Sequence, residues 1–188
     1  MIFKNKICTI EIVRDNTCNI NTINKGNYDI VYNLDEYNQD EYYAIISVKV
    51  NLYYDNFKIA LIGGAVDTNN NISILEENML IVLQNDMIIK INVLDGSIIL
   101  HKHLYSYGEN FEIYKIKNGY IIYGEGEITM LDKKFEVKWT FSGSDIFVSD
   151  SKRKAFSICE DNTIELYDWQ DNFYRINFNG ELLNKIKI

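Results

Sequence analysis

The sequence predicts an all-β fold of antiparallel β-meander repeats, propeller-like, with additional N-terminal strands. Short apolar runs alternate with turns rich in Asn, Asp and Gly, which is the pattern of strands joined by hairpins. The order of runs and turns recurs in the second half of the chain. The best helix candidate, residues 73–83, contains Ile81 and Val82, which prefer strands, so it too is predicted to be extended.

The first repeat begins at Asn78 and has apolar runs at 79–83, 87–94 and 97–103. Asp95-Gly96 separates two of these runs, and Gly accepts the positive φ of a tight hairpin turn. The last repeat follows the same order and turns at Asn179-Gly180. The two turn glycines lie 84 positions apart, so a middle copy is expected about halfway between them.

The middle repeat turns slightly early, at 132–134, and is followed by an alternating run. Phe135, Val137, Trp139 and Phe141 would share one face of this run, with polar residues on the other. A period of two predicts a half-buried strand over 135–141.

Two short motifs resemble known repeats. Leu131-Asp-Lys-Lys-Phe-Glu-Val-Lys-Trp139 resembles the quinoprotein-type β-propeller repeat, although Phe135 stands where that repeat has a turn glycine. Leu166-Tyr-Asp-Trp169 resembles the end of a WD40-type repeat in reversed order. The resemblance implies about three blade-like units over residues 78–186. It implies a scaffold and no cofactor, because no residues of a quinone site can be matched.

The predicted organisation is one continuous domain in two parts. Residues 1–71 hold the N-terminal strands and an acidic, Tyr-rich loop, and residues 72–188 hold the blade-like repeats. Strands are expected at 7–13, 28–32, 44–52 and 57–62 in the first part, where apolar runs are bounded by turn residues.

Charge and cysteine content limit the classes of function. The formal net charge is −8, and residues 27–56 carry six carboxylates against one lysine. An acidic surface argues against nucleic acid and is compatible with a basic protein partner. The three cysteines are odd in number and show no close pairing pattern, which argues against a disulfide framework. We expect a cytoplasmic protein, because neither a signal peptide nor a membrane span is legible. Its small size and acidic composition give it the look of a bacterial protein.

The acidic, Tyr-rich loop is the predicted partner-binding surface. Tyr offers a large, rigid contact area with a polar tip, and carboxylates steer a basic partner. The alternative is a solvated loop whose tyrosines lie on the protein's own surface. The predicted binding residues are Asp35, Glu36, Tyr37, Asp40, Glu41, Tyr42 and Tyr43.

His101 and His103 are the candidate metal ligands. They are the only histidines, and positions i and i+2 of a strand face the same side. No Asp, Glu or Cys accompanies them at a matching spacing, so two surface histidines without metal is the alternative. No catalytic residue is assigned, and the carboxylates Glu125, Glu127 and Asp168 are expected to be solvated.

The sequence thus predicts a non-catalytic protein-binding module without a cofactor. The specific hypothesis is an immunity protein that neutralises a basic toxin. The alternatives are a small-molecule or metal-dependent enzyme with a pocket between β-meanders, and a structural subunit of a larger assembly. The oligomeric state is left open.

Overall fold

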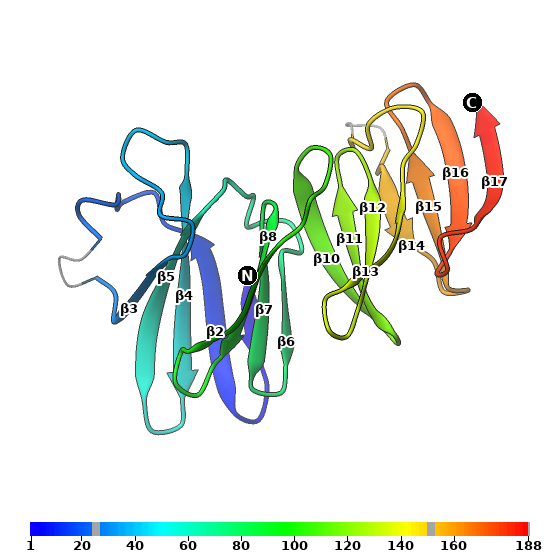
Figure 1. Cartoon of the computed structure of the whole chain (residues 1–188). Coiled ribbons are helices and arrows are strands. Elements are labelled where there is room, and N and C mark those ends of the chain that lie inside the picture. The colour runs from blue at the N-terminus through cyan, green and yellow to red at the C-terminus, as the bar shows by residue number, and fades with distance from the viewer. Residues whose placement is uncertain (24–26, 150–152, 188) are drawn as a thin grey trace. The chain divides into compact units, whose positions relative to one another are not determined.

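The computed structural model describes residues 1–23, 27–149 and 153–187, which form strands and no helix (Figure 1). None of these residues therefore belongs to a helix that could cross a membrane. The strands lie in one five-stranded and three four-stranded sheets, so the all-β prediction is confirmed. Contacts divide the chain into two compact units, Met1–Leu104 and Tyr105–Ile188.

The first unit begins with the five-stranded sheet. Neighbouring strands of this sheet pair antiparallel, apart from β3, which runs parallel to β5. Among the described strands, this pair is the one departure from the expected antiparallel pairing. In order of pairing, the strands are β1 (Ile2–Lys4), β2 (Cys8–Arg14), β4 (Ala44–Leu52), β5 (Asn56–Gly63) and β3 (Ile30–Asn33).

The first meander completes this unit. The segment 73–83 forms a hairpin of two strands, which confirms its extended conformation, and Glu77 takes a positive φ of 53° in the turn. The strands are β6 (Ser73–Glu76), β7 (Met79–Gln84), β8 (Met87–Asn92) and β9 (Ile98–His103), each antiparallel to the next.

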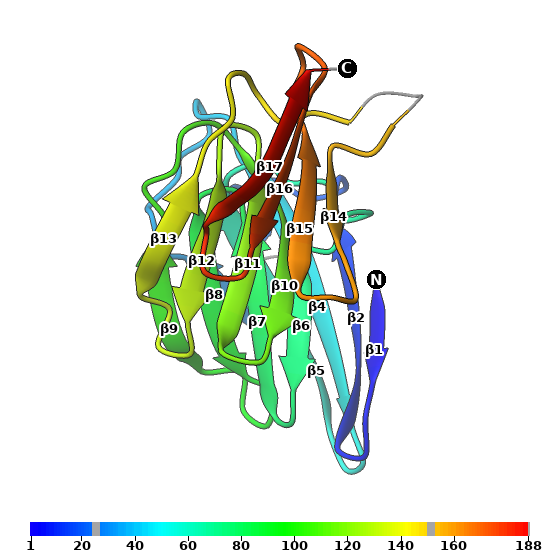
Figure 2. The same ribbon diagram turned by 90° about the vertical axis from the view of Figure 1, so that its right-hand side faces the viewer.

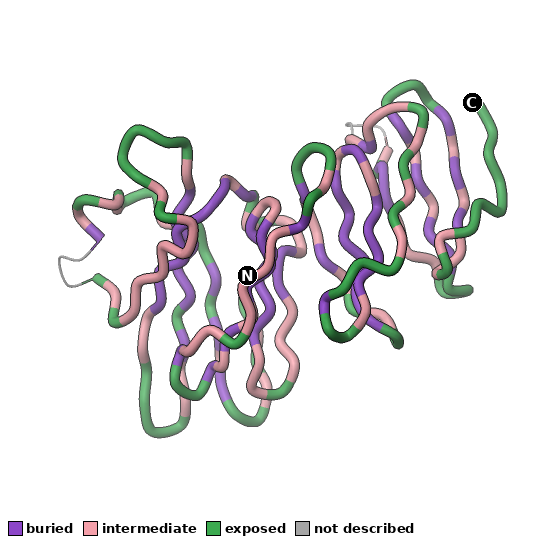
Figure 3. The backbone as a smooth tube through the Cα atoms, in the orientation of Figure 1, coloured by how far each residue is buried: buried purple, intermediate pink, exposed green. Residues whose placement is uncertain are grey.

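A single apolar core joins the five-stranded sheet to the first meander. Alternate residues such as Val48 and Val50 of β4 pack in one cluster with Val82 of β7 and Ile89 of β8. Figure 3 shows these strands as buried along most of their length. The first meander begins near the predicted boundary at 71/72, but the compact unit continues to Leu104 because of this shared core.

The opposite face of the five-stranded sheet has a smaller core. Ile45, Ala60 and Ile62 lie on that face and are buried beneath residues of the loops before β3 and before β4. Tyr37 and Tyr43 pack against this cluster as partly buried side chains. The acidic, Tyr-rich loop is therefore anchored to the sheet through its tyrosines.

The second unit consists of two meanders (Figure 2). Their shared core combines aliphatic side chains with the aromatic rings of Tyr123, Phe147, Phe156 and Tyr174. The strands are β10 (Asn110–Ile116), β11 (Gly119–Gly124), β12 (Ile128–Asp132), β13 (Val137–Phe141), β14 (Phe156–Ile158), β15 (Thr163–Tyr167), β16 (Asn172–Asn177) and β17 (Leu182–Lys187).

The last hairpin of each meander has the same construction. Each has a register shift beside the turn and one residue in the left-handed region: Gly96 (φ 76°), Phe135 (φ 63°) and Gly180 (φ 82°). The three turns are therefore equivalent, as their spacing in the sequence predicts.

The prediction that 135–141 is one strand was wrong at its start, because β13 begins at Val137 and Phe135 is a turn residue. Val137 is exposed rather than core-facing, because the register shift at this hairpin interrupts the alternation.

Candidate functional site

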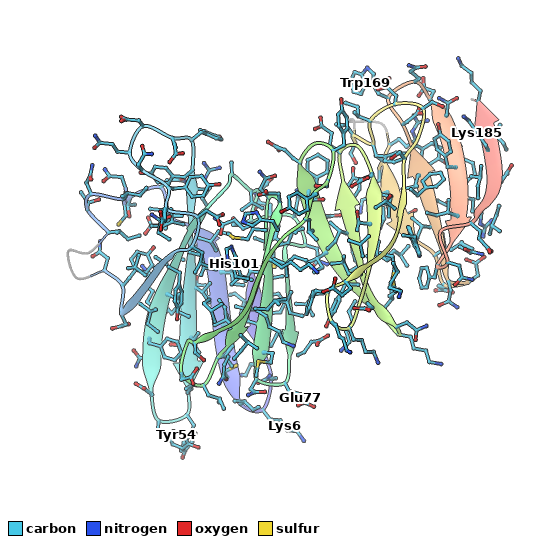
Figure 4. The ribbon with its side chains drawn as sticks, in the orientation of Figure 1. Lys6, Tyr54, Glu77, His101, Trp169 and Lys185 are labelled. Carbon is cyan, nitrogen blue, oxygen red and sulfur yellow. The ribbon has the colours of Figure 1, made fainter. Side chains whose placement is uncertain are left out.

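The two histidines lie on β9, which is an edge strand of the first meander. Their rings are 5.2 Å apart between centroids, as the i, i+2 spacing predicts. Figure 4 labels His101 on this strand. Both are partly buried: the side chains of His101 and His103 are 27% and 38% exposed. They are thus not freely solvated surface residues.

A carboxylate from a distant part of the chain meets both rings. Asp35 follows β3, and its Oδ1 lies 3.2 Å from His101 Nε2 and 3.0 Å from His103 Nε2. No acidic residue stands beside the histidines at a matching spacing in the sequence, but the fold brings in a carboxylate 68 positions away from His103. No local spacing could have signalled this contact.

Two further side chains complete the cluster. Asp86, in the turn between β7 and β8, places Oδ2 3.2 Å from His103 Nδ1. Burial lowers the pKa of His103, but the hydrogen bonds to Asp86 and Asp35 outweigh burial and raise that pKa above its ordinary value. Met87 Sδ lies 2.8 Å from His101 Nε2.

The remaining predicted binding residues divide into an inner and an outer set. Tyr37 and Tyr43 belong to the inner set, and their ring centroids are 6.5 Å apart. The hydroxyl of Tyr43 accepts a hydrogen bond from the backbone N–H of Ile20. Asp35 also points inward, toward the histidines.

The outer set is exposed and comprises Glu36, Asp40, Glu41 and Tyr42. Tyr42 is 77% exposed. The loop that carries the set has internal hydrogen bonds: Glu41 Oε2 accepts from both the backbone N–H and the side-chain amide of Asn38, each at 2.7 Å. These four residues are the part of the predicted surface that a partner can reach.

A groove of about 410 Å³ lies between the two meanders of the second unit. Trp139, Phe178 and Met130 line it together with the cations Lys117 and Lys138. The Trp139 Nε1–H donates to the Phe178 carbonyl, so the indole edge is already engaged. The groove is the kind of cavity that the small-molecule alternative requires.

Asp168 lies deep in the same unit and is structural rather than solvated, contrary to expectation. Its side chain accepts hydrogen bonds from the backbone N–H groups of Gln170 and Asn172, the Asn172 side-chain amide and the Tyr174 hydroxyl. Burial raises the pKa of this carboxyl, but these hydrogen bonds outweigh burial and lower it. Its lone pairs are occupied by donors that hold the turn before β16.

Comparison with known proteins identifies the fold. No protein-family model matches the chain, and no curated protein matches it. Among solved structures, the β-propeller protein dihydro-heme d1 dehydrogenase NirN in complex with DHE matches 81% of the chain at 12% identity, with a TM-score of 0.51.

The chain has a β-propeller-type fold. Two further similar structures are BamB from Moraxella catarrhalis and HIRA(644–1017). BamB matches 80% of the chain at 8% identity, with a TM-score of 0.46. HIRA matches 95% of the chain at 11% identity, also with a TM-score of 0.46. The chain spans 36% of the NirN chain and 49% of each of the other two. At such identities the likeness describes architecture, and function has to be argued from the chain's own residues.

Proposed function

We propose that the chain is a non-catalytic protein-binding module that captures a basic protein through the outer residues of its acidic loop. The acidic loop is residues 35–43, and its outer residues are Glu36, Asp40, Glu41 and Tyr42. The observation that carries the proposal is their exposure on a loop whose inner residues are held by the fold.

Charge supports a basic partner. The chain has a net charge of −8, and the stretch 27–56 contributes more than half of it. Carboxylates gathered on one surface raise the rate of encounter with a positively charged protein and disfavour acidic competitors. Tyr42 adds exposed aromatic area of the kind enriched at interfaces.

Hydrogen bonds hold the acidic loop in an ordered conformation, which supports binding by a preorganised surface. Asn33 accepts from the Tyr37 N–H at 2.9 Å and donates to the Tyr37 carbonyl at 2.8 Å, which fixes the start of the loop. Asn21 donates to the Gln39 side chain at 2.8 Å and ties the middle of the loop to the preceding segment. Binding by an ordered loop loses less conformational entropy than binding by a free one.

The finer hypothesis is an immunity protein that neutralises a basic toxin. Such a role requires rapid capture of a cationic protein and tight retention. The exposed carboxylates of the acidic loop support the first requirement, and its ordered backbone and exposed Tyr42 support the second. A catalytic apparatus is not needed for this role.

The test is capture of partners from a lysate of the source cell, with low-salt and high-salt elution and identification by mass spectrometry. Binding kinetics of the captured protein are then measured with the double variant Glu36→Gln/Asp40→Asn. We expect retention of a basic protein, release by salt, and a roughly tenfold lower association rate for the variant at low salt.

The matched control is Glu109→Gln/Glu160→Gln, which changes net charge equally at two exposed positions of the second unit. A local recognition surface predicts that this control leaves the association rate within about twofold. Equal slowing by both double variants would mean that net charge alone drives capture. An unaffected Glu36→Gln/Asp40→Asn variant would reject the acidic loop as the binding surface.

A structural subunit is the second candidate, and the edge strand β17 favours it. Leu182, Leu183 and Ile186 on this strand are each about half exposed. Exposed apolar edge strands can pair with another chain. Mass measurement in solution separates the two candidates: a stable oligomer that dissociates in a Leu183→Lys variant supports the subunit role, and a monomer at all concentrations contradicts it.

A further inference from the structure

We propose that Asp35, His101 and His103 form a binding site for a divalent transition-metal ion of the Zn²⁺ type. The three residues are the group of possible ligands that the described part of the chain brings together, with one ligand atom from each lying within 4.8 Å of the others. This metal site is independent of the binding function proposed above.

The distances within the cluster suit one shared ion. Zn²⁺ binds imidazole nitrogen and carboxylate oxygen at about 2.0–2.2 Å, so ligand atoms of a tetrahedral site are about 3.4 Å apart. Asp35 Oδ1 lies 3.2 Å from His101 Nε2 and 3.0 Å from His103 Nε2. The carboxylate oxygen thus already lies from each ring nitrogen at a separation close to that of coordinated ligands, and all three ligand atoms lie within 4.8 Å of one another.

Asp86 provides a second, independent indication. Histidines that bind metal usually donate their other ring N–H to a carboxylate or carbonyl, which fixes the tautomer and the ring orientation. Asp86 Oδ2 lies 3.2 Å from His103 Nδ1, on the opposite side of the ring from Asp35. This arrangement holds the Nδ1 proton at Asp86 and leaves the Nε2 lone pair for the ion.

The ligand types select the class of ion. Imidazole nitrogen suits Zn²⁺, Cu²⁺ and Ni²⁺, whereas Mg²⁺ and Ca²⁺ prefer sites made of oxygen. The sulfur of Met87, 2.8 Å from His101 Nε2, adds a soft atom beside the cluster and reinforces this preference. Three protein ligands leave the fourth tetrahedral position to water or another ligand.

The cluster lies where an ion can enter from solvent and where a bound ion would stabilise the first unit. Partial exposure of both imidazoles allows an ion to enter from solvent. An ion held by Asp35 and the two histidines ties the connection after β3 to β9. Because only the folded chain assembles these ligands, ion binding raises the thermal midpoint of the first unit.

The test uses tag-free protein stripped with a chelator and titrated with Zn²⁺ by calorimetry. We expect one Zn²⁺ per chain, a rise in thermal midpoint, and no displacement by millimolar Mg²⁺. His101→Gln and His103→Gln are each expected to weaken binding by at least about 100-fold, and Asp86→Asn by roughly 10–100-fold. Co²⁺ added in place of Zn²⁺ is expected to give the visible absorption of a tetrahedral N/O site.

Two variants serve as controls. Asp40→Asn removes an exposed carboxylate of the same loop, and Cys18→Ser removes a thiol that could bind Zn²⁺ adventitiously. Neither is expected to change the affinity by more than about twofold. Circular dichroism verifies that each variant is folded before metal is added. The proposal fails if stripped wild-type protein takes up no Zn²⁺, or if uptake survives both histidine substitutions or is lost with Cys18→Ser.

Discussion

Two partly or fully buried carboxylates, one in each unit, find their partners over very different distances along the chain. In the second unit, Asp168 bonds to groups two to six residues away, within a single hairpin. In the first unit, Asp35 meets His103 across 68 positions. Polar contacts inside a regular meander stabilise its own turn. Contacts made by the irregular N-terminal segment bring together groups that the repeat alone does not, and this is where a site can arise.

The largest effect that tests this contrast is expected from Asp168→Ala. Removal of the carboxylate leaves the buried donors of Asn172 and Tyr174 unpaired, together with the backbone N–H of Gln170, so the free energy of unfolding should fall by roughly 3–4 kcal/mol. Asp35→Ala, at a partly exposed position where water can replace the carboxylate, should cost less than about 1 kcal/mol in metal-free protein. Urea unfolding of both variants measures the difference. If both variants lost a similar free energy of unfolding, Asp168 could not be distinguished from Asp35 as the carboxylate that stabilises the fold.

A somewhat smaller effect is expected from Phe135→Gly, which compares the turn of the middle meander with its two glycine turns. Glycine relieves a non-glycine residue at φ 63°, worth about 1 kcal/mol. The substitution also removes a ring that is 3% exposed and stacked on Tyr120 at 4.8 Å between centroids. Loss of a buried Phe costs about 3–5 kcal/mol, so packing should win and the variant should lose roughly 2–4 kcal/mol.

Thermal or urea unfolding checks the Phe135→Gly prediction, with Gly180→Ala as the converse change. Gly180 has φ 82°, and a Cβ there would lie 2.7 Å from the Trp139 ring, so that variant should lose about 1–2 kcal/mol through backbone strain and crowding. If Phe135→Gly were more stable than wild type, turn conformation rather than ring packing would govern the stability of the middle hairpin.

The smallest effect is the acid dependence of stability that Asp168 contributes. The folded chain lowers the pKa of Asp168 below the unfolded value of about 3.9, so in acid the unfolded chain binds the proton more readily. This contribution is complete above the unfolded pKa and is lost as pH falls through the lowered folded pKa. Free energies of unfolding measured from pH 6 to pH 2.5 should therefore fall more steeply below pH 4 for wild type than for Asp168→Asn. Parallel curves would contradict the role assigned to this carboxyl.

Much of the architecture could be predicted because its signals are local. Apolar runs, Asn and Gly turns and a recurring order of strands identified the three meanders and the equivalence of the turns at Gly96 and Gly180. Phe135 was harder to interpret. Its place in the alternating pattern predicted a strand, and its place in the repeat predicted a turn. The repeat was the better guide, because stacking on Tyr120 offsets the unfavourable φ.

The candidate site was predicted in separate parts but not as a whole. The i, i+2 spacing placed His101 and His103 together, and the composition of 35–43 marked an acidic surface. No local pattern separates Asp35 and the anchored Tyr37 and Tyr43 from the exposed residues of the loop, which are Glu36, Asp40, Glu41 and Tyr42. That separation depends on the burial of the loop's tyrosines against the five-stranded sheet.

The sequence by itself determined that this chain forms strands, where they turn, and that it carries negative charge near its N-terminal third. These properties depend on side-chain periodicity, backbone preference and composition, each of which operates over a few residues. The tertiary structure alone decided that Asp35 meets the histidines of β9 and that Asp86 supports one of them. Contacts across tens of residues depend on how sheets pair and pack around a common core, and no local pattern encodes that geometry.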